Sequence, residues 1–198
     1  MDLGTTTYAG RHSKLFKDAA ELVVGPGGRP LQILEIGPGL SVRWLGRVSG
    51  KPAFIRIILK GVETVVRRLP LPDSCFENYE SEEILTAFGR QRSELSLMDV
   101  NPRPLRVIGQ NPKIPVAAKL TADLTALQLE PGHPQFEAFD VVVALTTLAR
   151  IPVDKRARAA ENIAAMTRRG GWVLADGNAI TREPSLQPTD VGNLSQKI

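Results

Sequence analysis

The chain has 198 residues, of which 42% are hydrophobic and 23% are charged, and its net charge is +4. This composition is typical of a globular protein and excludes disorder, collagen or a coiled coil as a description of the whole chain. One cysteine and two histidines argue against a disulfide framework and a zinc cage, so we expect no metal site.

Basic and acidic residues are interleaved along the chain rather than gathered in one stretch. That distribution favours a mixed, solvated surface over a nucleic-acid-binding face. Residues 1–10 lack the basic and apolar regions of a signal peptide, and no apolar stretch approaches the length of a membrane span. We therefore expect a cytoplasmic protein with no membrane partner.

The first part of the chain predicts a helix, a strand and a sharp turn. Residues 13–24 repeat apolar side chains at helical spacing, and the glycine-rich run 25–28 ends that helix. Residues 31–36 are a short apolar run that predicts a buried strand. The glycines of 37–39 then force a turn, and residues 41–48 predict a helix after it.

An insertion is predicted over about residues 51–91, within a single domain that spans residues 1–198. Two apolar runs, 53–59 and 62–69, predict strands, and residues 81–88 predict a helix. A connection this apolar must bury its side chains against something. We expect it either to cap a substrate site or to form a contact between copies in a homo-oligomer.

Three further strands are predicted at 95–100, 116–121 and 139–145. The last is a valine-rich run, as expected for a strand buried on both faces. Between the first two, Asn101 as a cap and Pro102 at the first helical position predict the start of a helix.

The C-terminal part predicts a helix over 152–169, with Arg168 and Arg169 in its last turn, and then a strand at 172–176. Residues 177–198 are polar and predict a loop or tail. The expected buried face of the helix comprises Ala157, Ala160, Ile163, Ala164 and Thr167.

Strands that alternate with helices predict an α/β fold with a mostly parallel sheet and helices on both faces. In such sheets the ligand lies beyond the carboxyl ends of the strands, beside the first strand. Asp99 and Asp123 each follow a predicted strand. Asp99 can accept hydrogen bonds from a ribose diol and Asp123 from an adenine amine, whereas the alternative for both is a capping role.

Five ordered motifs resemble those of class I S-adenosylmethionine-dependent methyltransferases, and their order and spacing carry the resemblance. It covers roughly residues 31–176, apart from the insertion. It implies a Rossmann-like fold, S-adenosylmethionine as cofactor, and methyl transfer to an oxygen or nitrogen of a small molecule. The motifs are EIGPG at 35–39, LMDVNP at 97–102, ADL at 122–124, FDVVVAL at 139–145 and RGGWVL at 169–174.

The resemblance also implies a set of site residues. Glu35 would hold the amino end of the cofactor, and Gly37 and Gly39 would line its methionine part. Asp99 would bind the ribose and Asp123 with Leu124 the adenine, while Ala144 would begin the floor of the methyl-transfer site. As catalytic residues the chain offers only His12 and Tyr8, and the alternative for His12 is an exposed side chain on a frayed terminus.

The chain departs from the family pattern in three places. Ser41 stands where a third glycine often occurs. The insertion separates Glu35 from Asp99 by far more than the roughly 20 residues usual in nucleotide-binding folds. Residues 177–198 are too short and polar for the antiparallel hairpin that ends the family's sheet, so we expect either a truncated hairpin or compensating structure from the predicted strands 53–59 and 62–69.

Two other functions remain open at this stage. If residues 53–59 were the second strand, Lys60 would stand at the ribose position and would suit the 2′-phosphate of an NADP-dependent oxidoreductase. The truncated C-terminal end also allows a non-catalytic cofactor-binding or interaction protein. The residues after the fourth strand, 146–149, lack the Pro-Pro-Tyr signature of adenine and glutamine methylation, which leaves a small molecule or another side chain of a protein as the substrate.

The predicted role of the insertion can be tested by deleting it. Replacement of residues 49–92 by a short Gly-Ser linker is expected to leave cofactor binding in place and to abolish turnover or dimerisation.

Overall fold

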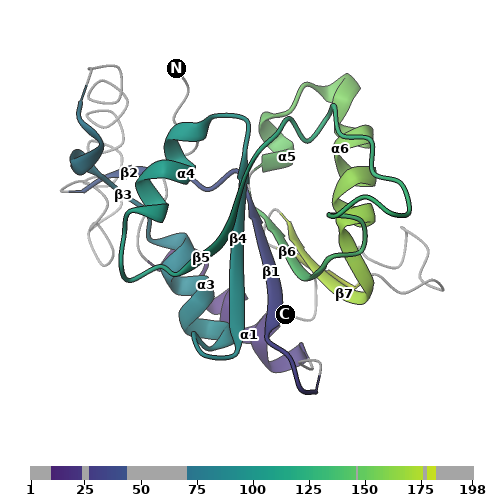
Figure 1. The fold of residues 1–198 in the computed structure, drawn as a ribbon, viewed down its shortest axis with the longest axis horizontal. Coiled ribbons are helices and arrows are strands. Elements are labelled where there is room, and N and C mark those ends of the chain that lie inside the picture. The colour runs from purple at the N-terminus through teal and green to yellow at the C-terminus, as the bar shows by residue number, and fades with distance from the viewer. Residues whose placement is uncertain (1–9, 24–26, 44–70, 146, 176–177, 182–198) are drawn as a thin grey trace.

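A six-stranded β-sheet forms the centre of the computed structural model (Figure 1). The structure describes residues 10–23, 27–43, 71–145, 147–175 and 178–181. The strand order is β5-β4-β1-β6-β7-β8; neighbouring strands run parallel, except that β8 is antiparallel to β7. The strands are β1 (Leu31–Ile36), β4 (Ser93–Asp99), β5 (Val116–Thr121), β6 (Phe139–Ala144), β7 (Thr167–Ala175) and β8 (Asn178–Thr181).

The predicted α/β fold class is confirmed. In chain order the five parallel strands lie third, second, first, fourth and fifth, which is the order of a Rossmann-like doubly wound sheet. Every residue of β6 is buried, which explains why all of them except Asp140 are apolar. Strands β1 and β5 have the predicted bounds because their apolar runs are short and are flanked by turn residues.

Helices cover both faces of the sheet (Figure 1). One face packs against α1 (Ser13–Leu22), α3 (Glu80–Phe88) and α4 (Pro102–Gly109), with Phe16, Ile84 and Leu105 in that core. The other face packs against α6 (Val153–Met166), with Ile163 and Met166 buried, and the short α5 (Thr147–Arg150) lies beside it. None of the helices in the described ranges is long and apolar enough to span a bilayer.

The helix predicted at 41–48 is wrong at its start. Ser41–Val42 form the short strand β2, which pairs antiparallel with β3 (Phe76–Glu77), and a 3-10 turn, η1 (Asp73–Cys75), precedes β3. Both residues of β2 are fully buried, so pairing with a distant segment outweighs the local helical signal. Residues 44–48 and the predicted strands at 53–59 and 62–69 lie outside the described residues.

Helix α3 belongs to the layer of helices that covers one face of the sheet, although the sequence predicts it within the insertion. Ile84 and Leu85 are completely buried between α3 and the sheet. The chain enters α3 at Asn78, whose side-chain nitrogen donates to the Gly39 carbonyl at 2.6 Å and whose oxygen accepts from the Ser81 amide at 2.7 Å. The extra chain therefore lies between the glycine turn and α3, and the proposed excision of residues 49–92 would remove a core helix.

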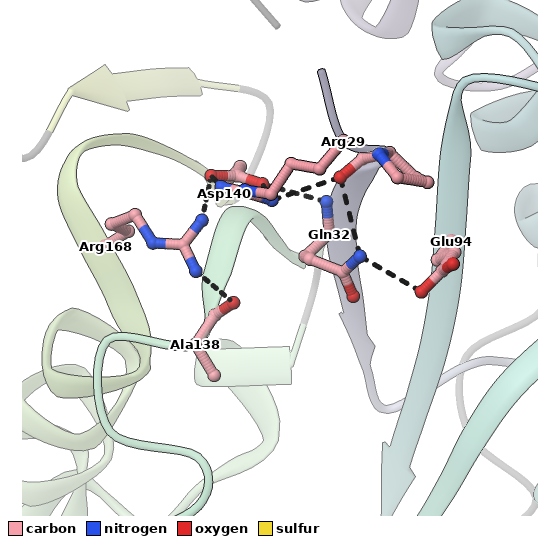
Figure 2. A network of polar contacts seen from close by, with 7 residues as sticks. Arg29, Gln32, Glu94, Ala138, Asp140 and Arg168 are labelled. Carbon is pink, nitrogen blue, oxygen red and sulfur yellow. Dashed lines mark hydrogen bonds and ion pairs between the residues drawn. The ribbon is translucent and has the colours of Figure 1, made fainter. Parts of the chain in front are cut away.

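Helix α6 ends at Met166, three residues before the predicted end. Thr167 already pairs with Phe139, and Arg168 turns back to bind Asp140, as Figure 2 shows. The expected buried face is also wrong except at Ile163 and Thr167. The buried positions of the helix are Ala159, Asn162, Ile163 and Met166.

Strand β7 contains an irregularity between Thr167 and Trp172, where Asp140 alone faces four residues of β7. A Cβ atom on Gly171 would lie 2.8 Å from the carbonyl oxygens of Arg168 and Asp140, so this approach of two backbones requires glycine.

Strand β8 corrects the prediction of a loop from residue 177 onward. Its backbone pairs with β7, from Trp172 opposite Thr181 to Ala175 opposite Asn178. An edge strand can form from polar residues because the backbone supplies the hydrogen bonds. The hairpin expected to be truncated spans residues 177–198; β8 supplies one antiparallel strand of it, and residues 182–198 lie outside the described residues.

Candidate functional site

The candidate site lies where the strand order reverses. Strand β1 has β4 on one side and β6 on the other, so the carboxyl ends of these three strands meet. Glu35 and Gly37 come from the end of β1, Asp99 from the end of β4, and Thr147 from the start of α5 after β6. Doubly wound sheets bind ligands at this position.

Glu35 is a buried acid with one oxygen that lacks a partner. Its side chain is on the α3 face of the sheet, and the residue is only 2% exposed. Oε2 accepts a hydrogen bond from the Ser81 hydroxyl of α3. Oε1 is fully buried and has no hydrogen-bond partner among the described residues. A buried acceptor without a donor is costly, and a ligand that supplied the donor would remove that cost.

The surroundings of Glu35 favour its neutral form. Burial, which has the largest effect, and the nearby carboxylates of Glu80 and Asp99 together raise the pKa of Glu35 from 4.5 to about 8, against the opposite effect of the Ser81 hydrogen bond. Removal from water and neighbouring negative charge both disfavour the carboxylate. Without a ligand, Glu35 is therefore mostly protonated at neutral pH.

The turn after β1 requires glycine at position 37. Gly37 has a φ of +68°, and its amide donates to the Met98 carbonyl at 2.8 Å. A Cβ atom there would lie 2.8 Å from the Thr147 hydroxyl, which donates to the Ile36 carbonyl at 2.8 Å. The Thr147 side chain at the start of α5 therefore packs directly against the backbone that follows β1. Gly39 is buried beside this turn.

Asp99 ends β4 and begins the turn into α4. Its Oδ1 accepts from the Asn101 amide at 2.8 Å, and its carbonyl accepts from the Ala122 amide at 3.2 Å. The predicted cap is confirmed, because Asn101 accepts from the Arg103 amide at 3.0 Å and Pro102 opens the helix. Asp99 is half-buried, so its carboxylate borders the edge of the site.

Val100 is a candidate that the sequence reasoning missed. It directly follows Asp99 and is 69% exposed, although most large apolar side chains of the described chain are buried or half-buried. An apolar side chain left in water beside the ligand edge suits a flat, aromatic ligand group. Its exposure depends on the turn into α4, which no local pattern reveals.

Of the residues predicted to face the adenine and the methyl-transfer site, one is exposed and two are buried. Asp123 is exposed and stabilises its own turn, since Oδ1 accepts from the Thr125 amide and hydroxyl, both at 2.8 Å. These bonds, the amide first, lower the pKa of Asp123. Leu124 and Ala144 are buried in the core on the α6 face, and Asn162 holds the Leu124 carbonyl at 2.7 Å. The capping alternative for Asp123 is thus present in the structure.

His12 is held close to the acids of the candidate site. Its Nδ1 lies 3.0 Å from Glu80 Oε1, and its side chain is only 14% exposed, so the alternative of an exposed histidine on a frayed end is wrong. Glu83, one turn along α3 from Glu80, accepts from the Ser13 hydroxyl at 2.9 Å and from the Gly10 amide. The start of α1 is therefore attached to the start of α3. Tyr8 lies outside the described residues.

Two cavities lie away from this edge. One, of about 580 Å³, lies between β3, the start of α3 and the end of α4, and includes Phe76, Tyr79 and Lys113 in its lining. The other, of about 540 Å³, lies between α1 and α3. Glu35, Gly37 and Asp99 line neither cavity. Over the described ranges, no group of three or more metal-ligating side chains is assembled.

The topology removes the premise of the oxidoreductase alternative. Both sides of β1 are occupied, by β4 and β6, and the strand that follows β1 in the described chain and pairs with it is β4. The residue at the end of the neighbouring strand is Asp99 rather than Lys60. An acidic residue at that position suits free ribose hydroxyls and repels a 2′-phosphate.

No family model and no curated protein matches the sequence. Among solved structures, the chain is similar to the N-methyltransferase NodS from Bradyrhizobium japonicum WM9 in complex with S-adenosyl-L-homocysteine, at 18% identity and a TM-score of 0.48, over 83% of this chain and 59% of that one. The chain is also similar to CalS10, an amino pentose methyltransferase from Micromonospora echinaspora with S-adenosylmethionine bound, at 13% identity and a TM-score of 0.46, over 82% of this chain and 49% of that one.

A Rhodobacter sphaeroides protein assigned as a Zn-dependent alcohol dehydrogenase matches at 14% identity and a TM-score of 0.46, over 85% of this chain and 46% of that one. The chain thus spans about half the length of these three structures. At these scores the matches carry no argument about function.

Proposed function

We propose that the protein is an S-adenosylmethionine-dependent methyltransferase that acts on an oxygen or nitrogen of a small molecule. The observation that carries this proposal is Glu35, a buried acid whose unpartnered oxygen lies at the carboxyl end of β1, two residues before Gly37. A cationic amino group is the donor that would complete this site.

The residues present fit the cofactor at three points. The amino group of its methionine part would donate to Glu35 Oε1, and the Thr147 side chain, packed against Gly37, leaves no room there for a side chain at position 37. Asp99 would accept from the ribose hydroxyls. Val100 offers an exposed apolar surface for the adenine, and Asp123 is an exposed acceptor at the end of the next strand.

Methyl transfer from S-adenosylmethionine requires little from the protein beyond binding and alignment. The cofactor supplies a methyl group on a positively charged sulfur, which is already a strong electrophile. Glu35, Asp99 and the Gly37 turn would hold and orient it, since alignment and exclusion of water account for most of the catalysis of such a transfer. A base is needed only for a protonated acceptor, and the imidazole of His12, which lies beside Glu80, is the candidate for this role.

Calorimetric titration with S-adenosylhomocysteine and, separately, with NADP tests the proposal. We expect binding of the first ligand only. Binding of NADP alone would restore the oxidoreductase alternative. Binding of S-adenosylhomocysteine without turnover over a panel of small amines, alcohols and phenols would favour the non-catalytic cofactor-binding protein.

Replacement of Asp99 by alanine is expected to weaken S-adenosylhomocysteine binding by about 1.5–3 kcal/mol, or roughly 10- to 150-fold, the scale of hydrogen bonds to a charged group. Calorimetry provides the measurement, and circular dichroism checks that the variant folds. Glu94→Ala is the matched control, because Glu94 is an exposed acid near the other end of the same strand. Equal affinity of a folded Asp99 variant and the wild type would remove Asp99 from the site.

Asp123→Asn is expected to reduce the preference for adenine over hypoxanthine in the base of the ligand. A carboxylate can only accept, so it favours the adenine amine, whereas an amide can also donate to the hypoxanthine oxygen. Competition between S-adenosylhomocysteine and its inosyl analogue measures this preference. If wild type and variant rank the two bases alike, Asp123 serves only its own turn.

Excision of residues 45–70 replaces the larger deletion of 49–92. Antiparallel pairing holds the flanking segments together, since the Arg43 amide donates to the Cys75 carbonyl at 2.9 Å, so a short Gly-Ser linker can bridge them. We expect S-adenosylhomocysteine binding to persist, and turnover or self-association to be lost. Calorimetry, activity assays and sedimentation measure the three properties; a variant that keeps all of them would show that the segment is dispensable.

A further inference from the structure

Glu35 and the two acids whose charges act on it come from three different elements. Glu35 lies on β1, Asp99 at the end of β4 and Glu80 at the start of α3, and the charges of the latter two act on Glu35. We call these three residues the acid cluster. A cluster of acids alone indicates little, but here one member is almost completely buried and has an unpartnered oxygen within the cluster.

Within the described part of the chain, the groups that face Glu35 supply no compensating positive charge. From α3 it receives the hydroxyl of Ser81 and the charge of Glu80, and from β4 the charge of Asp99. The strand on its other side, β6, places Val143 in register with it. On α1, the imidazole of His12 is paired with Glu80, and Ser13 is paired with Glu83. A buried carboxylate in these surroundings would lack both a cation and a second donor.

We propose that the unliganded protein carries a proton on Glu35 and that the cofactor's ammonium group displaces it, so that binding releases one proton to the solvent. This inference rests on the proposed function. In the exchange the carboxylic acid loses its proton to water or buffer, and the resulting carboxylate pairs with the ammonium group. No bond of the cofactor changes.

The exchange follows from the same electrostatics that keep the empty site neutral. An ammonium group brings a positive charge and a hydrogen-bond donor to Oε1, and both favour the charged form of the acid. The raised pKa of Glu35, about 8, agrees with a proton that is present at neutral pH and ready to leave. Each pH unit below this value is expected to weaken binding about tenfold, because the ligand competes with a proton.

Titration calorimetry of the wild type with S-adenosylhomocysteine at pH 6.0, 6.5, 7.0 and 7.5 is the primary test. This ligand lacks the charged sulfur, so its ammonium group is the only cation involved. Each pH is measured in two buffers with different ionisation enthalpies, since the slope of apparent enthalpy against ionisation enthalpy gives the number of protons released. We expect close to one proton at pH 7.0, and affinity that rises about tenfold from pH 6.0 to 7.0.

Two further experiments assign the proton. Methylthioadenosine lacks the amino acid part and is expected to bind without proton release. The variant Glu35→Gln is expected to bind S-adenosylhomocysteine more weakly at pH 7.5, with no proton release and little pH dependence. His12→Gln should keep the release, because the imidazole contacts Glu80 rather than Glu35. Glu94→Gln controls for the loss of an acid elsewhere on the sheet.

Binding of S-adenosylhomocysteine without proton release would overturn this inference and leave the proposed function intact. Proton release that persists with methylthioadenosine, or that disappears in His12→Gln, would also overturn it, by assigning the proton to another group. Failure of S-adenosylhomocysteine to bind at any pH would overturn both. The buffer series needs only the wild type, so the inference stays testable even if Glu35→Gln does not fold.

Discussion

Glu35→Gln is expected to reduce the pH dependence of the stability of the unliganded protein. From pH 5 to pH 8, the free energy of unfolding of the wild type should fall by about 3 kcal/mol more than that of the variant, whereas a control variant should behave like the wild type. The reason is the pKa of Glu35, which is about 8 in the folded protein and ordinary in the unfolded chain. Between these two values the folded state binds more protons than the unfolded state. The stability of the wild type therefore falls as pH rises from about 4.5 to 8, and glutamine removes this fall.

Urea unfolding at both pH values measures the effect, and the double difference cancels the pH-independent cost of the amide group. Glu94→Gln is the control, because its carboxyl group is exposed. If wild type and Glu35→Gln lose the same stability between pH 5 and pH 8, Glu35 is not the buried acid described here. The expected effect does not depend on the cofactor. It would show that the buried acid of the candidate site lowers the stability of the folded protein.

Asp140→Ala is expected to lower the free energy of unfolding by about 2–4 kcal/mol, because one carboxylate joins three strands at the edge opposite the candidate site. Figure 2 shows the network. Oδ1 accepts from Arg29 at 2.7 Å and from Arg168 at 2.5 Å, and Oδ2 accepts from Arg29 and from the Gln32 amide at 2.7 and 2.9 Å. Both arginine side chains are 37% exposed, so water limits the cost of leaving them unpaired.

Urea unfolding at neutral pH measures this loss. Glu161→Ala is the matched control, since its ion pair with Arg158 is exposed and lies within α6, where such a pair contributes at most about 0.5 kcal/mol. S-adenosylhomocysteine affinity should be unchanged in the folded Asp140 variant, because Asp140 is near the amino end of β6. A loss of stability no larger than that of the control would show that the network is dispensable.

Local patterns were sufficient for much of the fold. Strands β1, β5 and β6 followed from apolar runs of the right length, and the start of α4 followed from Asn101 and Pro102, because these signals act within a few residues. The failures share a physical cause. The pairing of β2 with β3 and the end of α6 at the Arg168–Asp140 contact, 28 residues apart in sequence, depend on partners that no local window contains.

The same division holds at the candidate site. Local patterns were enough to predict that Glu35 with Gly37, then Asp99 and Asp123, follow strands, and the parallel sheet places the ends of its strands along one edge. The protonation state of Glu35, in contrast, depends on contacts that form only when the chain folds. Ser81, 46 residues from Glu35, and the charges of Glu80 and Asp99 reach Glu35 through folding, and burial between them makes it a neutral acid with an unpartnered oxygen. Protonation depends on the local dielectric and on neighbouring charge, and packing sets both.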